Sequence, residues 1–182
     1  MVATFFGTSS LFGGVVFEVT FLRQIFSVTP GFAALMGTLV GTALISVGAV
    51  VGGHIVTRIG RKRLAVTAGF SAGLVTLLAY FMQNLGAFLS LRWISAFLIG
   101  VTVAAASNLM LEQVPQFRGT MMSLSSAFSG LGTAVGIAVV GAVLNLYVDA
   151  TTGFQALGLT VGAFGFAGTF VYIFFAREPV QT

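Results

Sequence analysis

Six long apolar segments alternate with short polar ones along the chain. They cover about residues 4–26, 33–56, 64–81, 87–111, 121–147 and 154–176. A bilayer-spanning helix needs roughly 17–25 mostly apolar residues. The segments are apolar on every face, unlike the alternating strands of about 10 residues in membrane barrels. The pattern predicts an all-α membrane protein with one six-helix bundle over residues 1–182. Pro30 and Gly31 are expected to form the first turn between helices.

Composition agrees with a membrane location and narrows the chemistry. Charged residues make up 7% of the chain, against roughly 25% in soluble domains. The net charge of +4 is too small to indicate nucleic-acid binding. The absence of cysteine excludes disulfides, thiolate metal sites and cysteine nucleophiles. One histidine and four scattered acids offer no metal site and no protease centre. We therefore expect no metal, no cofactor and no enzymatic activity.

The stretch "GGHIVTRIGRKR", residues 52–63, concentrates the positive charge between two apolar segments. It holds four of the eight basic residues. Short cytoplasmic loops of membrane proteins collect Lys and Arg. With the N-terminus inside, six basic residues are cytoplasmic and two are on the outer side. This bias predicts a multi-pass protein of the plasma or inner membrane with both termini in the cytoplasm. Phosphate or lipid-headgroup binding by the same cluster stays open. The inner residues are Arg58, Arg61, Lys62, Arg63, Arg118 and Arg177, and the outer ones are Arg23 and Arg92.

The same stretch resembles the loop between the second and third helices of a six-helix half in the major facilitator superfamily. The usual form of that loop is G-x-x-x-D-R-x-G-R-[RK]. Five positions match, and Thr57 stands where the acid is expected. Residues 114–144 resemble the tenth-to-eleventh helix region of drug-efflux and sugar-efflux members, and "FFAREP" resembles their ending. The matching residues are Gly53, Arg58, Gly60, Arg61 and Lys62.

The resemblance implies the C-terminal half of a twelve-helix secondary transporter, with inverted three-helix repeats. The implied activity is proton-coupled export of a small molecule by alternating access, in a lipid bilayer. The length leaves three explanations: a fragment of a longer gene, a half-transporter that pairs with a second copy, or an inactive copy. The lack of a long loop before Thr4 favours a fragment that lacks the N-terminal six helices. The alternative function is a non-transporting membrane scaffold that acts through assembly with another subunit.

Two ionisable residues fall inside the predicted spans, where charge is costly. Glu18 lies about 12 Å and Arg92 about 7.5 Å below the outer surface, at 1.5 Å per residue. In the family, the first and fourth helices of each half line the central cavity. Glu18 is therefore expected to exchange a proton or attract a cationic substrate, with Arg92 rather than Arg23 as its partner. A structural ion pair, or snorkelling of the arginines to headgroups, is the alternative.

Three further polar residues are candidates. Asn108 is expected either to hydrogen-bond in a cavity or to join two helices. Glu112 and Arg118 flank the fourth polar turn. We expect them to contact each other or the "GRKR" segment and so to latch the cytoplasmic side.

Small residues repeat on most of the predicted spans. In the second span, one stripe of glycines predicts a tight helix contact. Its members are Gly37, Gly41, Gly48 and Gly52.

Overall fold

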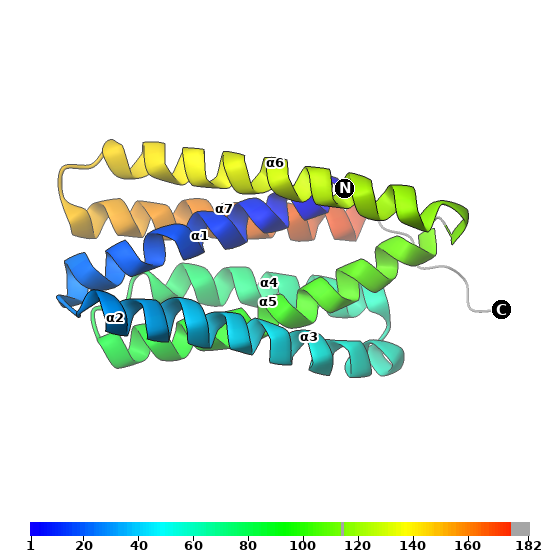
Figure 1. Cartoon of the computed structure of the whole chain (residues 1–182), viewed down its shortest axis with the longest axis horizontal. Helices are drawn as coiled ribbons and strands as arrows, with labels where there is room; N and C mark the ends of the chain where they lie inside the picture. Colours follow the sequence, from blue (N-terminus) through cyan, green and yellow to red (C-terminus); the bar gives the residue numbers. More distant parts are fainter. Residues whose placement is uncertain (114, 176–182) are drawn as a thin grey trace.

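The computed structural model describes residues 1–113 and 115–175, and in these it contains only helices and turns. Six of the helical segments are long and apolar enough to cross a membrane (Figure 1). An all-α bundle of six spans was predicted, and this fold class is confirmed. The elements are α1 (Val2–Phe26), α2 (Pro30–Ala33), the π-helix η1 (Ala34–Leu39), α3 (Val40–Ile59), α4 (Arg61–Ala79), α5 (Leu85–Gln113), the 3₁₀ helix η2 (Pro115–Phe117), α6 (Arg118–Asn145) and α7 (Ala150–Phe175).

The second span begins earlier than the apolar pattern suggested. Pro30 and Gly31 were expected to form a turn, but they start a continuous helical run over Pro30–Ile59. Thr29 is the N-cap, and its hydroxyl accepts a hydrogen bond from the Phe32 amide at 3.4 Å. Proline suits the first helical position because its missing N–H has no intrahelical partner there. The turn prediction for these two residues was therefore wrong.

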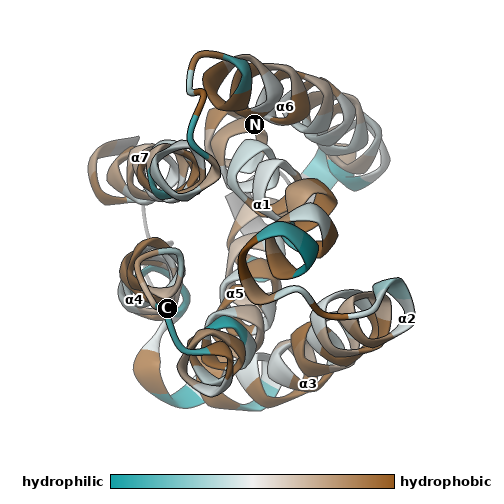
Figure 2. Cartoon of the chain, turned by 90° about the vertical axis from the view of Figure 1, so that its left-hand side faces the viewer, coloured by the Kyte–Doolittle hydropathy of each residue, from teal (hydrophilic) through white to brown (hydrophobic). Residues whose placement is uncertain are grey.

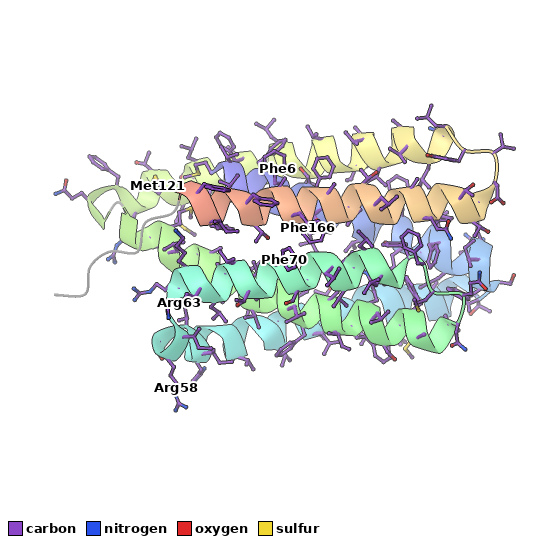
Figure 3. The ribbon with its side chains drawn as sticks, turned by 180° about the vertical axis from the view of Figure 1, so that it is seen from behind. Phe6, Arg58, Arg63, Phe70, Met121 and Phe166 are labelled. Carbon is purple, nitrogen blue, oxygen red and sulfur yellow. The ribbon has the colours of Figure 1, made fainter. Side chains whose placement is uncertain are left out.

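The two ends of the bundle differ in charge, and we name them accordingly. The basic end holds Met1, the turn at residue 60 and the start of α6, and Arg58 and Arg63 lie there in Figure 3. The far end holds the turns at residues 27–29, 80–84 and 146–149. Helix α1 runs from the basic end to the far end, and α5 runs in the opposite direction (Figure 1).

Helices α1 and α5 occupy the middle of the bundle, between the α4/α7 pair and the α3/α6 pair (Figure 2). Helix α1 packs mainly against α6 and α7, whereas α5 packs mainly against α3 and α4. Exchanging α1 with α5, α3 with α6 and α4 with α7 leaves this set of neighbours unchanged. Because α1 and α5 are antiparallel, the exchange also reverses the bundle axis. The arrangement is that of two inverted three-helix repeats.

Glycines set the closest helix crossings. Gly48 and Gly100 lie where α3 meets α5, and Gly132 and Gly136 lie where α6 meets α1. A Cβ on any of these four would overlap backbone atoms of the facing helix. Gly41 was expected in the same contact stripe, but a Cβ there would meet nothing within 4 Å. Crossed helices touch only near the crossing point, and Gly41 lies two turns away from it.

Aromatic side chains fill the far half of the bundle. The Phe21 ring lies 4.6 Å from Phe88, 4.9 Å from Phe154 and 5.2 Å from Tyr80, measured between ring centroids. All four side chains are buried. The buried core toward the basic end consists of smaller side chains: Val56, Leu64, Ala65, Ala68, Val101 and Ala105.

Candidate functional site

A buried ion pair joins the two central helices in the far half of the bundle. Arg92 on α5 donates from Nε to Glu18 Oε2 on α1 at 3.0 Å, and its Nη2 lies 3.0 Å from the same oxygen. Glu18 is 1% exposed and Arg92 is 5% exposed. The structure thus brings together the two residues that the helix-face argument paired, whereas Arg23 points to the exterior.

The second oxygen of Glu18 faces the π-helix η1. Glu18 Oε1 would lie 3.3 Å from a Cβ on Gly37, so a glycine is what lets the carboxylate fit against this segment. Tyr80 is an electrostatic neighbour of both members of the pair, and its hydroxyl donates to the Gly14 carbonyl at 3.2 Å. Among the described residues, Glu18 Oε1 and Arg92 Nη1 have no hydrogen-bond partner. The pair therefore retains capacity for one further donor and one further acceptor.

The π-helix itself is tied to α5. The Trp93 indole donates from Nε1 to the Met36 carbonyl at 3.0 Å. Short π-segments inside α-helices occur often at functional sites. Sequence reasoning did not assign Trp93, Tyr80 or Gly37 to this site. Gly37 was assigned only to a packing stripe, and nothing in the local pattern marks a π-helix.

A cavity of about 820 Å³ opens in the basic half. Its walls come from α1, α4, α5, α6 and α7, and among the described residues none of the side chains that line it is Lys, Arg, Asp or Glu. Phe70 on α4 and Phe166 on α7 lie between these two helices, with ring centroids 5.1 Å apart (Figure 3). Hydroxyl groups recur on the cavity wall, among them Thr8, Ser10, Thr76, Thr102, Ser125 and Thr169.

The loop residues singled out by the family motif surround the α3–α4 turn. Gly60 has φ 91° and ψ 146°, and it is the one glycine with positive φ in the described part of the chain. Gly53 has open space where a Cβ would stand. Thr57, in the place of the motif acid, donates its hydroxyl to the His54 carbonyl at 2.9 Å. Arg58 is exposed. Arg61 and Lys62 begin α4, and both make contacts with other groups.

The remaining candidates lie apart from the ion pair. Asn108 is half-buried on α5, between Ser107 and Leu109, which line the cavity. Arg118 begins α6 at the basic end and is exposed. The side chain of Glu112 lies outside the described residues, so the expected latch stays a prediction.

Two comparisons of the sequence relate the chain to known proteins. The sequence model of the Major Facilitator Superfamily matches residues 1–182. The niacin transporter NiaP of Acinetobacter baylyi is 29% identical over 171 residues, which are 92% of this chain and 36% of that relative. The chain thus spans little more than a third of the relative's length. Since the match of the family covers every residue, the chain belongs to the major facilitator superfamily.

Proposed function

We propose that the chain is one six-helix half of a secondary active transporter, in which the Glu18–Arg92 pair couples proton movement to the transport of a small molecule. The observation that carries the proposal is the burial of a complete ion pair between the two central helices. Ionisable groups at this depth are costly, and they mark ion and substrate pathways in membrane proteins.

The ion pair has two proposed states, one with Glu18 ionised and paired and one with Glu18 protonated and released from Arg92. While Glu18 is ionised, the attraction to Arg92 holds α1 and α5 together in the far half. A proton on Glu18 removes that attraction and leaves a buried cation, which costs several kcal/mol. An anionic substrate group can then take the place of Glu18 at Arg92. Protonation and substrate binding thereby favour a different arrangement of the central helices, as alternating access requires.

A second six-helix half is the proposed partner. In an apolar stretch of 18 residues, only 11% of the residues are buried in the span Pro30–Ile59, which contains α3, and 17% in α6, whereas the values for the other four spans are 33–39%. Helices α3 and α6 are related by the internal repeat and lie on the same side of the bundle (Figure 2). We propose that this side faces the missing half, or a second copy of the chain, and that α4 and α7 face lipid.

The substrate class follows from the free donor on Arg92. Its Nη1 has no partner among the described residues, and a guanidinium binds a carboxylate well. Niacin is a pyridine carboxylic acid, and a relative is a niacin transporter. Nicotinate is therefore the first substrate to test. The proposed direction is export, because residues 114–144 resemble efflux members. The proposed orientation places the basic end in the cytoplasm of a cell with a plasma or inner membrane.

The test is flux of labelled nicotinate in proteoliposomes that contain the intact transporter, with and without an imposed pH gradient. Glu18→Gln is expected to abolish the response to the gradient while the protein stays folded in the membrane. Arg23→Gln, on the exposed side of the same helix, is the matched control and should leave that response unchanged. Gradient-driven flux at the wild-type rate in Glu18→Gln would reject the coupling role and favour a structural role for the pair.

A further inference from the structure

A pair of buried hydroxyl groups lies between the ion pair and the cavity. Thr76 on α4 and Ser95 on α5 are 5% and 0% exposed, and their hydroxyls are hydrogen-bonded to each other. Most hydroxyls in these spans donate to a carbonyl of their own helix, as Thr102 does to Leu98. The Thr76–Ser95 bond crosses between helices instead. Thr76 also lines the cavity.

Helix geometry links this hydroxyl pair to the site. Ser95 lies three residues after Arg92 on α5, and Thr76 lies four residues before Tyr80 at the end of α4. Residues at these spacings are same-face neighbours, with about 5–6 Å between their Cβ atoms. Thr76 on the cavity wall, Ser95, and then the Arg92–Glu18 pair therefore follow one another as polar groups from the cavity into the far half. The buried cluster in the far half consists of aromatic and aliphatic side chains.

Two neighbours pack against α1 at Gly14, between the cavity and Glu18. Gly14 lies one turn from Glu18 on the cavity side, and its carbonyl accepts the Tyr80 hydroxyl at 3.2 Å. A Cβ on Gly14 would meet Val161 at 3.5 Å, so α7 packs closely against α1 at Gly14. Thr76 and Ser95 are the buried hydroxyls of α4 and α5 between the cavity and the acid.

We propose that the Thr76–Ser95 hydroxyl pair relays protons between water in the cavity and Glu18. The proposal rests on the coupling role of Glu18 stated above. A hydronium ion in the cavity donates a proton to the Thr76 oxygen, and Thr76 passes its own hydroxyl proton to Ser95. The Ser95 hydroxyl, which donates to the Ala72 carbonyl at 3.4 Å, turns and passes its proton to a bridging water, and that water protonates Glu18. Each hydroxyl ends with one proton, Glu18 becomes neutral, and Arg92 keeps its charge.

The last step of the relay uses the open capacity of the ion pair. A bridging water needs polar partners, and Glu18 Oε1 and Arg92 Nη1 are the buried side-chain atoms without one among the described residues. The ionisable groups that face Glu18 are Arg92 from α5 and Tyr80 from the end of α4. In the described residues, η1 carries no ionisable side chain, and α6 and α7 carry theirs, Arg118 and Tyr172, toward the basic end. Glu18 is therefore the acceptor at the end of the path.

The test follows protonation of Glu18 directly, so it needs no substrate. The intact transporter in lipid nanodiscs is shifted rapidly from alkaline to acidic pH, and the carboxyl infrared band that Glu18→Gln removes is followed in time. The double variant Thr76→Val with Ser95→Ala should slow the rise of this band by about tenfold or more, with the same final amplitude. The matched control is Thr102→Val, which removes a cavity hydroxyl that bonds only within its own helix. It should keep the wild-type rate.

The outcomes separate the two proposals. If Glu18→Gln removes no pH-dependent band, Glu18 does not titrate and its coupling role fails together with the relay. If the band exists but the double variant protonates at the wild-type rate, the relay alone is overturned. Equal slowing in Thr102→Val would also overturn it, because the effect would then come from general loss of cavity hydration. Should the double variant not fold, each single variant is expected to slow protonation, and a wild-type rate in both contradicts the proposal.

Discussion

The far half and the basic half of the bundle share one set of helix neighbours but hold different chemistry. The internal repeat exchanges the two halves, because its partner helices run in opposite directions. The far half nevertheless contains the ion pair and the aromatic cluster around Phe21, and the basic half contains small side chains and a cavity of about 820 Å³. Backbone arrangement and side-chain chemistry are thus separable here. The helix crossings come from glycines, and the proposed function rests on the residues that break the symmetry.

The largest expected effect on stability comes from removing one charge of the buried Glu18–Arg92 pair in the far half. Arg92→Met leaves Glu18 buried without its partner and should lower the free energy of unfolding by about 3–5 kcal/mol. Arg23→Met, on the exposed side of α1, should change it little. The measurement is denaturation in mixed micelles, followed by helical circular dichroism.

A double variant tests whether the loss of stability comes from the unpaired buried charge. Glu18→Gln with Arg92→Met removes both charges and should recover most of the loss, since a neutral replacement of a buried pair is often tolerated. Similar stability for Arg92→Met and Arg23→Met would show that the buried charge of Arg92 matters no more to stability than an exposed one.

The next prediction compares side-chain packing in the far half with packing in the basic half. Phe21→Ala removes a ring that touches four other aromatic rings, and it should cost about 3–5 kcal/mol of unfolding free energy. Ile99→Ala, on the cavity wall, should cost about 2 kcal/mol or less, because that side chain already lacks partner atoms on one side. The same unfolding assay compares them, and a cost for Ile99→Ala equal to that of Phe21→Ala would mean that the cavity collapses in solution.

The turns at the two ends should respond in opposite directions. Gly60 at the basic end has φ 91° and ψ 146°, a region that is nearly restricted to glycine, so Gly60→Ala should cost about 1–3 kcal/mol. Ser27 at the far end has φ 54°, so Ser27→Gly relieves left-handed strain and should stabilise by up to about 1 kcal/mol. Gly53→Ala, in a helix with open space around it, is the control. A neutral Gly60→Ala would indicate that the turn relaxes.

The smallest expected effect compares two helical glycines. Gly7 lines the cavity and has nothing within 4 Å of an added Cβ, so Gly7→Ala should stabilise by roughly 0.5–1 kcal/mol. Gly37→Ala places its Cβ 3.3 Å from both Glu18 Oε1 and Leu22, and it should not gain this stability. Thermal unfolding in matched detergent resolves the difference. An equal gain in both variants would mean that the η1 contact with Glu18 is loose.

The fold and part of the site were predictable from the sequence because they rest on strong local patterns. Long apolar runs leave few alternatives to membrane helices, and Glu18 stands out as the one acid deep in a predicted span. Arg92 followed as its partner because the two helices it could join were known from the resemblance. The match over residues 1–182 confirms the resemblance to the superfamily, while the efflux subtype stays a proposal.

The rest depends on distances between helices, which a sequence pattern does not contain. Tyr80 was assigned to no site, although its hydroxyl lies near the ion pair. The Thr76–Ser95 bond joins ordinary residue types whose spans become neighbours only in the bundle. The π-helix and the cavity arise from how six helices accommodate each other. Gly41 is the opposite case. Its spacing fits the glycine stripe in the sequence, but a Cβ there would meet no neighbouring helix.

The separation of Glu18 and Arg92 along the chain has a consequence for biogenesis. Arg92 is synthesised 74 residues after Glu18, which is a delay of roughly 4–15 s at about 5–20 residues per second. During that time α1 carries an acid whose insertion at the bilayer centre costs about 2.5–3.5 kcal/mol. Nascent α1 must therefore enter lipid with a neutral carboxyl group or remain beside the translocon until α5 emerges. In either case, the Glu18–Arg92 pair forms only after the ribosome has begun the second three-helix repeat.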